Sequence, residues 1–264
     1  MGGVSKLALI EETLFGTVDK VQIAIDRLKA FEPVDGYWLA FSGGKDSVVI
    51  KRLAQMAGVK FEAHYSVTSV DPPELVRFIK DVHPGVSFDI PRYKDGTAIT
   101  MWNLIPLKRM PPFRVARYCC EKLKESAGDG RVIVTGVRWA ESANRKKNRN
   151  LVDIQTGKKS EAIIYNDDND EARRAVEQCY RTHKTLVNPI IDWTDDDVWE
   201  FIKCNEVSYC CLYDQGYKRL GCIGCPMNHA AAAAELEDYP KYKDAYLRAF
   251  ARMIKERKKH NNIS

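Results

Sequence analysis

Short hydrophobic runs and helix-like spacings of hydrophobic residues alternate along this chain, and this alternation predicts strands that are each followed by a helix. Asp71 before two prolines and Thr194 before three aspartates predict helix starts. Strands that alternate with helices predict an α/β fold with a doubly wound, mainly parallel sheet and helices on both faces. Ligands of such sheets bind beyond the carboxyl ends of the strands. The strands are predicted at residues 37–41, 61–67, 86–90, 132–135 and 185–191.

Three segments differ in character along the chain. Residues 1–35 predict a helical segment, and residues 36–227 carry the predicted sheet. Inside the second segment, residues 145–183 form a charged insertion with a predicted hairpin. We interpret this insertion as a lid, a partner-binding arm or a solvent-exposed loop without a specific role. The last segment, residues 228–264, predicts a helical tail rich in Lys and Arg. This tail is either a solvated helix or a contact for nucleic-acid phosphates.

Composition narrows the class of protein. The 264 residues contain no apolar stretch long enough to cross a bilayer and no secretory leader, so we expect a cytoplasmic protein without a membrane partner. The net charge of +5 suits anionic ligands. Eight cysteines in a chain without an export signal favour metal ligation or thiol chemistry over a disulfide framework.

The first predicted strand runs into the sequence SGGKDS, which predicts an anion-binding loop at the start of a helix. The two glycines allow the backbone to approach an anion, and the first amides of the helix point at it. The lysine adds a mobile positive charge, and Asp46 either caps the helix or helps to hold Mg²⁺. The spacing is too short for a Walker A loop. The loop consists of Ser42, Gly43, Gly44, Lys45, Asp46 and Ser47.

SGGKDS resembles the pyrophosphate loop of the adenine nucleotide alpha-hydrolase superfamily, which contains N-type ATP pyrophosphatases and the reductases of adenylylsulfate (APS) and phosphoadenylylsulfate (PAPS). The segment TGVRWAESANR resembles the reductases as well. Position by position, this resemblance implies that Gly136, Arg138 and Arg145 join the loop in binding the nucleotide. An arginine after a strand at this sheet edge is expected near the phosphates. Lys45 and Arg138 are the catalytic candidates, since they would stabilise charge that develops there.

Two cysteine pairs stand far apart in the sequence. Cys119 and Cys120 are adjacent in a predicted helix, and Cys222 and Cys225 form a CxxC motif. An adjacent pair fits a zinc ribbon poorly, whereas CxxC with remote cysteines suits a cubane iron–sulfur cluster.

This arrangement resembles the assimilatory adenylylsulfate reductases, which implies a [4Fe-4S] cluster held by all four thiolates. The related DNA-phosphorothioation proteins use one early and three late cysteines, and that pattern implies Cys119, Cys211, Cys222 and Cys225. The fourth ligand therefore stays open between Cys120 and Cys211. We also expect the nucleotide and the cluster to share one pocket.

The resemblance leaves the reaction open. Reductases of this family finish with a cysteine whose thiolate attacks the sulfonucleotide; here no cysteine follows Cys225, and Cys179 is a substitute within the insertion. We therefore favour an ATP pyrophosphatase that adenylates an acceptor for sulfur insertion, with Mg²⁺, a nucleic-acid or small-molecule acceptor and a sulfur-donor protein. The alternatives are reduction of APS or PAPS to sulfite by thiols, and a non-enzymatic, nucleotide-gated iron–sulfur subunit.

Overall fold

The computed structural model describes residues 9–13, 16–125, 127–156, 159–163 and 184–261. Cys179 and most of the second half of the predicted insertion lie outside the described residues. The chain divides into two compact units, each built from three stretches of sequence. The first unit contains residues 1–65, 78–87 and 128–216, and the second contains residues 66–77, 88–127 and 217–264.

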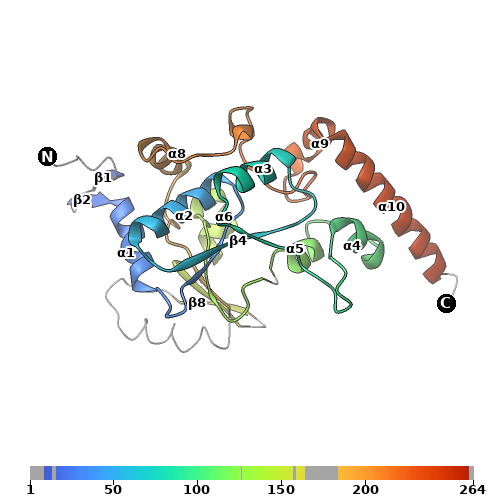
Figure 1. Cartoon of the computed structure of the whole chain (residues 1–264), viewed down its shortest axis with the longest axis horizontal. Coiled ribbons are helices and arrows are strands. Elements are labelled where there is room, and N and C mark those ends of the chain that lie inside the picture. Colours follow the sequence, from blue (N-terminus) through green and yellow to red (C-terminus); the bar gives the residue numbers. More distant parts are fainter. Residues whose placement is uncertain (1–8, 14–15, 126, 157–158, 164–183, 262–264) are drawn as a thin grey trace. The chain divides into compact units, whose positions relative to one another are not determined.

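The chain forms a seven-stranded sheet in the order β5-β4-β3-β6-β9-β7-β8, of which Figure 1 labels β4 and β8. Strand β3 is parallel to β4 and to β6, and β6 is parallel to β9. The predicted mainly parallel α/β fold is confirmed. The strands are β3 (Tyr37–Ala40), β4 (Phe61–Ser66), β5 (Ser87–Asp89), β6 (Val132–Val134), β7 (Val152–Thr156), β8 (Lys159–Ile163) and β9 (Lys184–Val187).

The hairpin predicted within the insertion is β7 and β8, and it extends the sheet. Strand β7 pairs antiparallel with both β8 and β9. The side chain of the fully buried Asn188 donates to the backbone oxygen of Asn150 at 2.8 Å and to Asp153 at 3.2 Å. These bonds fix the end of β9 to the start of β7. The sequence predicts the hairpin from its local pattern, but its pairing with a strand about thirty residues away is a tertiary contact.

The first unit covers the sheet with helices whose ends follow the sequence signals. Asp19 caps α1, and Thr194 caps α8 in a reciprocal arrangement with Asp197. Gly58, in the left-handed region at φ 69°, ends α2. A short hairpin, β1 (Ile10–Thr13) and β2 (Gly16–Asp19), precedes α1 where the sequence analysis predicts only helix. The helical elements are α1 (Lys20–Ala30), α2 (Lys45–Ala57), η1 (Trp139–Glu141), α6 (Ala143–Asn148), α8 (Asp195–Cys204) and η2 (Cys211–Tyr213), and α3 (Pro73–Val82) begins at its predicted prolines.

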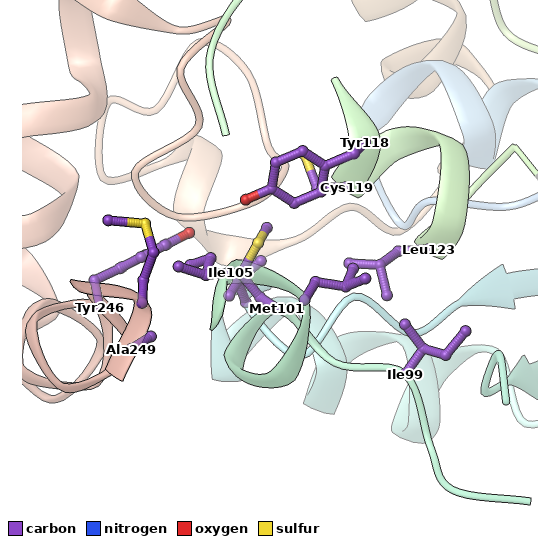
Figure 2. Packing of buried hydrophobic residues seen from close by; sticks show 11 residues of the cluster. Ile99, Met101, Ile105, Tyr118, Cys119, Leu123, Tyr246 and Ala249 are labelled. Atoms are coloured by element: carbon purple, nitrogen blue, oxygen red, sulfur yellow. The ribbon is translucent and has the colours of Figure 1, made fainter. Parts of the chain in front are cut away.

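The second unit is built on four helices around its own hydrophobic cluster. They are α4 (Met101–Lys108), α5 (Tyr118–Leu123), α9 (His229–Asp238) and α10 (Pro240–Asn261). Figure 2 shows Met101 and Ile105 of α4, Cys119 of α5 and Tyr246 of α10 gathered in this cluster. The sequence analysis does not predict α4, because MWNLIPLK is apolar almost throughout and gives no amphipathic pattern.

Among the helices in the described residues, none combines the length and the apolar character that crossing a membrane requires.

Candidate functional site

The SGGKDS loop connects β3 to α2 through a glycine turn. Gly43 has φ 75°, a conformation that favours glycine, and Gly44 is the N-cap of α2. The Ser47 hydroxyl donates to the Gly44 carbonyl at 2.8 Å, and the hydroxyls of Ser42 and Ser47 are 3.3 Å apart. The serines therefore brace the turn, and the N-terminus of a 13-residue helix lies at the end of a central strand.

Two cations and two carboxylates form a compact network beside this loop. Arg138 donates from Nε to Asp46 at 2.7 Å and from Nη2 to Asp195 at 2.5 Å. The Nζ atom of Lys45 lies 3.5 Å from Asp46 and 3.4 Å from Asp195. Lys45 is 6% exposed and Arg138 is fully buried. These two cations are balanced by the two carboxylates.

The structure brings Arg138 to the loop, where its guanidinium bonds the carboxylates of Asp46 and Asp195. A third bond runs from Nη1 to the Trp193 carbonyl at 3.3 Å. From the sequence we expect Arg138 to bind phosphate oxygens directly. Its observed contacts instead orient Asp46 and Asp195, so a direct phosphate contact stays a prediction.

Of the other two residues carried over from the resemblance, Gly136 lies beside the start of α2, and Arg145 is linked to Arg138 through Glu141. A Cβ atom on Gly136 would approach the Cβ of Asp46 to 2.9 Å, so only glycine lets β6 end this close to the loop. Arg145 forms an ion pair with Glu141, and the Glu141 carboxylate accepts from the Arg138 backbone amide at 3.1 Å. Arg145 is therefore tied to the segment that holds Arg138.

Tyr213 and Asp195 are site residues to which sequence reasoning assigns no role at the loop. The Lys45 amide donates to the Tyr213 hydroxyl at 2.9 Å, so a side-chain oxygen occupies the amide that an anion would use. Burial raises the pKa of Tyr213 above its ordinary value. The Arg138 hydrogen bond and Lys45 lower the pKa of Asp195, against the effect of burial. Asp195 is one of three aspartates in the first turn of α8, and no local pattern distinguishes it from the other two.

The second unit contains four of the five candidate cysteine ligands. Cys119 and Cys120 lie together in α5, and their side chains are hydrogen-bonded. Cys222 interacts electrostatically with Cys119 and with Cys225. The buried Tyr246 is within electrostatic range of Cys119, Cys222 and Cys225. Residues about a hundred positions apart are thus neighbours, as the iron–sulfur hypothesis requires.

Basic side chains accompany these thiols. The hydrogen bond from Cys119 lowers the pKa of Cys120, with a further hydrogen bond from Arg117, and the same pairing raises the pKa of Cys119. Burial raises the pKa of Cys222 to about 11, although Lys124 opposes this rise. Cys222 in turn raises the pKa of Lys124, whose ammonium hydrogen-bonds the sulfur. Positively charged side chains therefore lie beside Cys120 and Cys222.

The donor set suits an iron–sulfur cluster in chemistry and neighbourhood. In the described part of the chain, however, no three Cys, His, Asp or Glu side chains have the geometry of a preformed metal site. Cys211, the alternative fourth ligand, is exposed in η2 of the first unit, whereas Cys120 contacts Cys119 directly. The fourth ligand therefore stays open between Cys120 and Cys211.

Each candidate site lies within a single unit: the loop network in the first and the four thiols in the second. Their predicted meeting in one pocket stays a prediction.

The mostly parallel sheet and the glycine loop at its carboxyl edge define an adenine nucleotide alpha-hydrolase-like protein. Residues 36–228 match the phosphoadenosine phosphosulfate reductase domain, and the chain belongs to this family. The solved structure of a PAPS reductase from Candida auris has a TM-score of 0.51 and 13% identity, covering 78% of this chain and 88% of that one. The solved structure of FMN adenylyltransferase from Candida glabrata, in complex with FAD and inorganic pyrophosphate, has a TM-score of 0.50 and 12% identity. The match covers 77% of this chain and 62% of that one.

Two curated relatives extend this comparison. An uncharacterised protein of Methanocaldococcus jannaschii is 28% identical over 221 residues, which are 81% of this chain and 46% of that protein. The adenosine 5'-phosphosulfate reductase of Staphylococcus haemolyticus is 30% identical over 112 residues, 40% of this chain and 36% of that protein. The chain thus spans less than half the length of these two relatives.

Proposed function

We propose that this chain binds ATP on the SGGKDS loop and adenylates an acceptor that then receives sulfur. The observation that carries the proposal is the position of Lys45: its amide lies in the first turn of α2, and its ammonium is held beside the same turn. Backbone amides and a buried cation at a helix N-terminus form a site for phosphate oxygens. Among proteins with this fold, the comparisons name both a sulfonucleotide reductase and an adenylyltransferase, so the fold alone does not choose the reaction.

In the proposed step, an acceptor oxygen attacks the α-phosphorus of ATP. The bond from this phosphorus to the oxygen bridging the β-phosphorus breaks, and pyrophosphate leaves with the negative charge. Lys45 is placed to exchange its carboxylate partners for the leaving phosphates, while Arg138 keeps Asp46 and Asp195 in position. A later attack by a sulfur donor, supplied by a partner protein, would release AMP.

Magnesium fits the charge balance of this site. Because Asp46 and Asp195 already balance Lys45 and Arg138, the network has no excess positive charge for a triphosphate. Mg²⁺ commonly binds through one or two carboxylates together with substrate phosphates. Asp46, with its side chain 22% exposed, and Asp195, 64% exposed, are the residues that would hold it.

The thiols of the second unit are the proposed ligands of a [4Fe-4S] cluster. Cys119, Cys120, Cys222 and Cys225 would hold it, and Arg117 and Lys124 would compensate the charge of the thiolates. Such a cluster, when bound, supplies an iron site for sulfur or for an electron. Cys211 stays the alternative to Cys120.

Tyr213 gives a first prediction for nucleotide binding. A phosphate that takes the Lys45 amide must displace the Tyr213 hydroxyl. Because one hydrogen bond contributes about 1 kcal/mol net, we expect Tyr213→Phe to bind ATP about fivefold more tightly. Isothermal titration measures this affinity. Tyr209→Phe is the matched control, since its hydroxyl donates to Asp214. Weaker binding by Tyr213→Phe would show that the hydroxyl serves the bound nucleotide.

The reaction itself is tested by anaerobic incubation of the purified chain with ATP, APS or PAPS. We expect ATP to be consumed and pyrophosphate to appear when a competent acceptor is added. Sulfite formed from APS or PAPS with a thiol reductant would instead establish the reductase alternative. If neither product appears but ATP tightens binding to a partner protein, the chain is a nucleotide-gated subunit.

A further inference from the structure

Helices α4 and α10 pack together in the second unit, and Figure 1 labels both. A basic hollow is lined by residues from these two helices and from the C-terminal end of α4. Its volume is about 740 Å³. Arg109 enters it from the C-terminal end of α4, and three further cations enter it from α10: Arg252, Lys255 and Lys259. Glu256 is the acidic residue in its wall, and Lys259 bonds its carboxylate at 2.8 Å. The wall therefore has a clear excess of positive charge.

The spacing of these cations fits a chain of phosphates better than a single anion. Arg252, Lys255 and Lys259 occupy one side of α10 and are all exposed. From the first to the third, the helix rises about 10 Å. A row of this length is longer than one phosphate group, so it can contact more than one phosphate of a strand.

A second hollow continues this surface at the end of α4. Its volume is about 520 Å³, and its lining includes Lys108 and Arg117 together with Met110, Glu121 and Glu125. Lys108 and Arg109 are consecutive residues that line different hollows, so the two hollows flank the same helix end. Arg117 also hydrogen-bonds Cys120, which places this second hollow beside the candidate cluster ligands.

Exposed apolar side chains accompany the cations. Leu107 is 60% exposed and lines the first hollow, Met110 is 40% exposed and lines the second, and Phe113 is 44% exposed. A duplex hides the faces of its bases, whereas an unpaired strand offers them to aromatic and apolar side chains. Cations beside exposed apolar groups therefore match a single strand.

We propose that the α4–α10 surface binds a single-stranded segment of nucleic acid, and that the acceptor of the proposed adenylation is carried on that strand. The phosphates lie along Arg252, Lys255 and Lys259, and the strand continues past the end of α4 toward Arg117. The identity of the acceptor rests on the proposed function. Binding of the strand does not, because it is measured without ATP.

The test uses the full chain and fluorescein-labelled 20-nucleotide single strands of DNA and RNA, with a duplex of the same sequence, in fluorescence anisotropy. We expect saturable binding that weakens steeply with salt and favours the single strand over the duplex. Arg252→Glu combined with Lys255→Glu should weaken binding at least tenfold and flatten its salt dependence. The matched control reverses two exposed lysines of α10 that line neither hollow, Lys241→Glu with Lys258→Glu, and should change affinity less than threefold.

Phe113→Ala separates stacking from charge. We expect it to weaken binding at least about fivefold while leaving the salt dependence unchanged, since base stacking carries little counterion release. Comparing the DNA and RNA strands shows which nucleic acid is preferred. The proposal would be overturned if the chain bound no single strand at low salt or bound the duplex more tightly. It would also be overturned if Arg252→Glu with Lys255→Glu lost no more affinity than the control variant Lys241→Glu with Lys258→Glu. Pyrophosphate release by a chain that binds no strand would overturn this inference and leave the proposed function intact.

Discussion

Replacing Cys222 by serine is expected to remove the iron and the visible colour from protein purified without oxygen. Cys222 interacts electrostatically with Cys119 and with Cys225, and it accepts a hydrogen bond from Lys124. A serine hydroxyl does not ionise at neutral pH and is a poor ligand for iron, so the substitution takes away one of four anchors. Iron content and absorbance in the charge-transfer region measure the result.

Cys204→Ser is the matched control for this substitution. Cys204 is exposed at the C-terminal end of α8 in the first unit, and it should be replaceable without loss of iron. Separate Cys120→Ser and Cys211→Ser variants decide the fourth ligand, and we expect the first of them to lose iron. Colourless wild-type protein with stoichiometric zinc would contradict the cluster, and unchanged iron in Cys222→Ser would remove Cys222 from the ligand set.

Lys45→Ala is expected to lower the rate of pyrophosphate release from ATP about a hundredfold, the size typical for removing one charge-stabilising donor from an active site. ATP binding should weaken as well, since hydrogen bonds to charged groups contribute about 1.5–3 kcal/mol. The fold should persist, because Arg138 still bonds both Asp46 and Asp195 after the lysine is removed. Single-turnover assays and ATP titrations measure the two effects.

Lys29→Ala provides the comparison for Lys45→Ala, since Lys29 is an exposed lysine of α1. We expect it to match the wild type in both assays. A melting temperature that stays near the wild-type value in Lys45→Ala would separate lost function from lost structure. If ATP affinity were unchanged in this variant, the SGGKDS loop would not be the nucleotide site.

The sequence by itself determined the parallel sheet and the anion-binding loop. Both depend on local signals: an apolar run long enough for a buried strand, two glycines where the backbone must turn, and helix caps such as Thr194. Each of these signals depends on only a few neighbouring residues, so it can be recognised in the sequence without knowledge of the tertiary structure. The family likeness carried by SGGKDS and TGVRWAESANR is equally local, and the match over residues 36–228 confirmed it.

Only the tertiary structure decided what surrounds these motifs. Arg138 follows its predicted strand, yet its burial against Asp46 and Asp195 depends on residues about 92 and 57 positions away in the sequence. The contact between Tyr213 and the Lys45 amide, the helix α4 and its basic hollow with α10 were likewise missing from the sequence analysis. The physical reason is the same in each case: hydrogen bonds and ion pairs act at a few ångströms, and the distance between two residues in space is set by the packed fold.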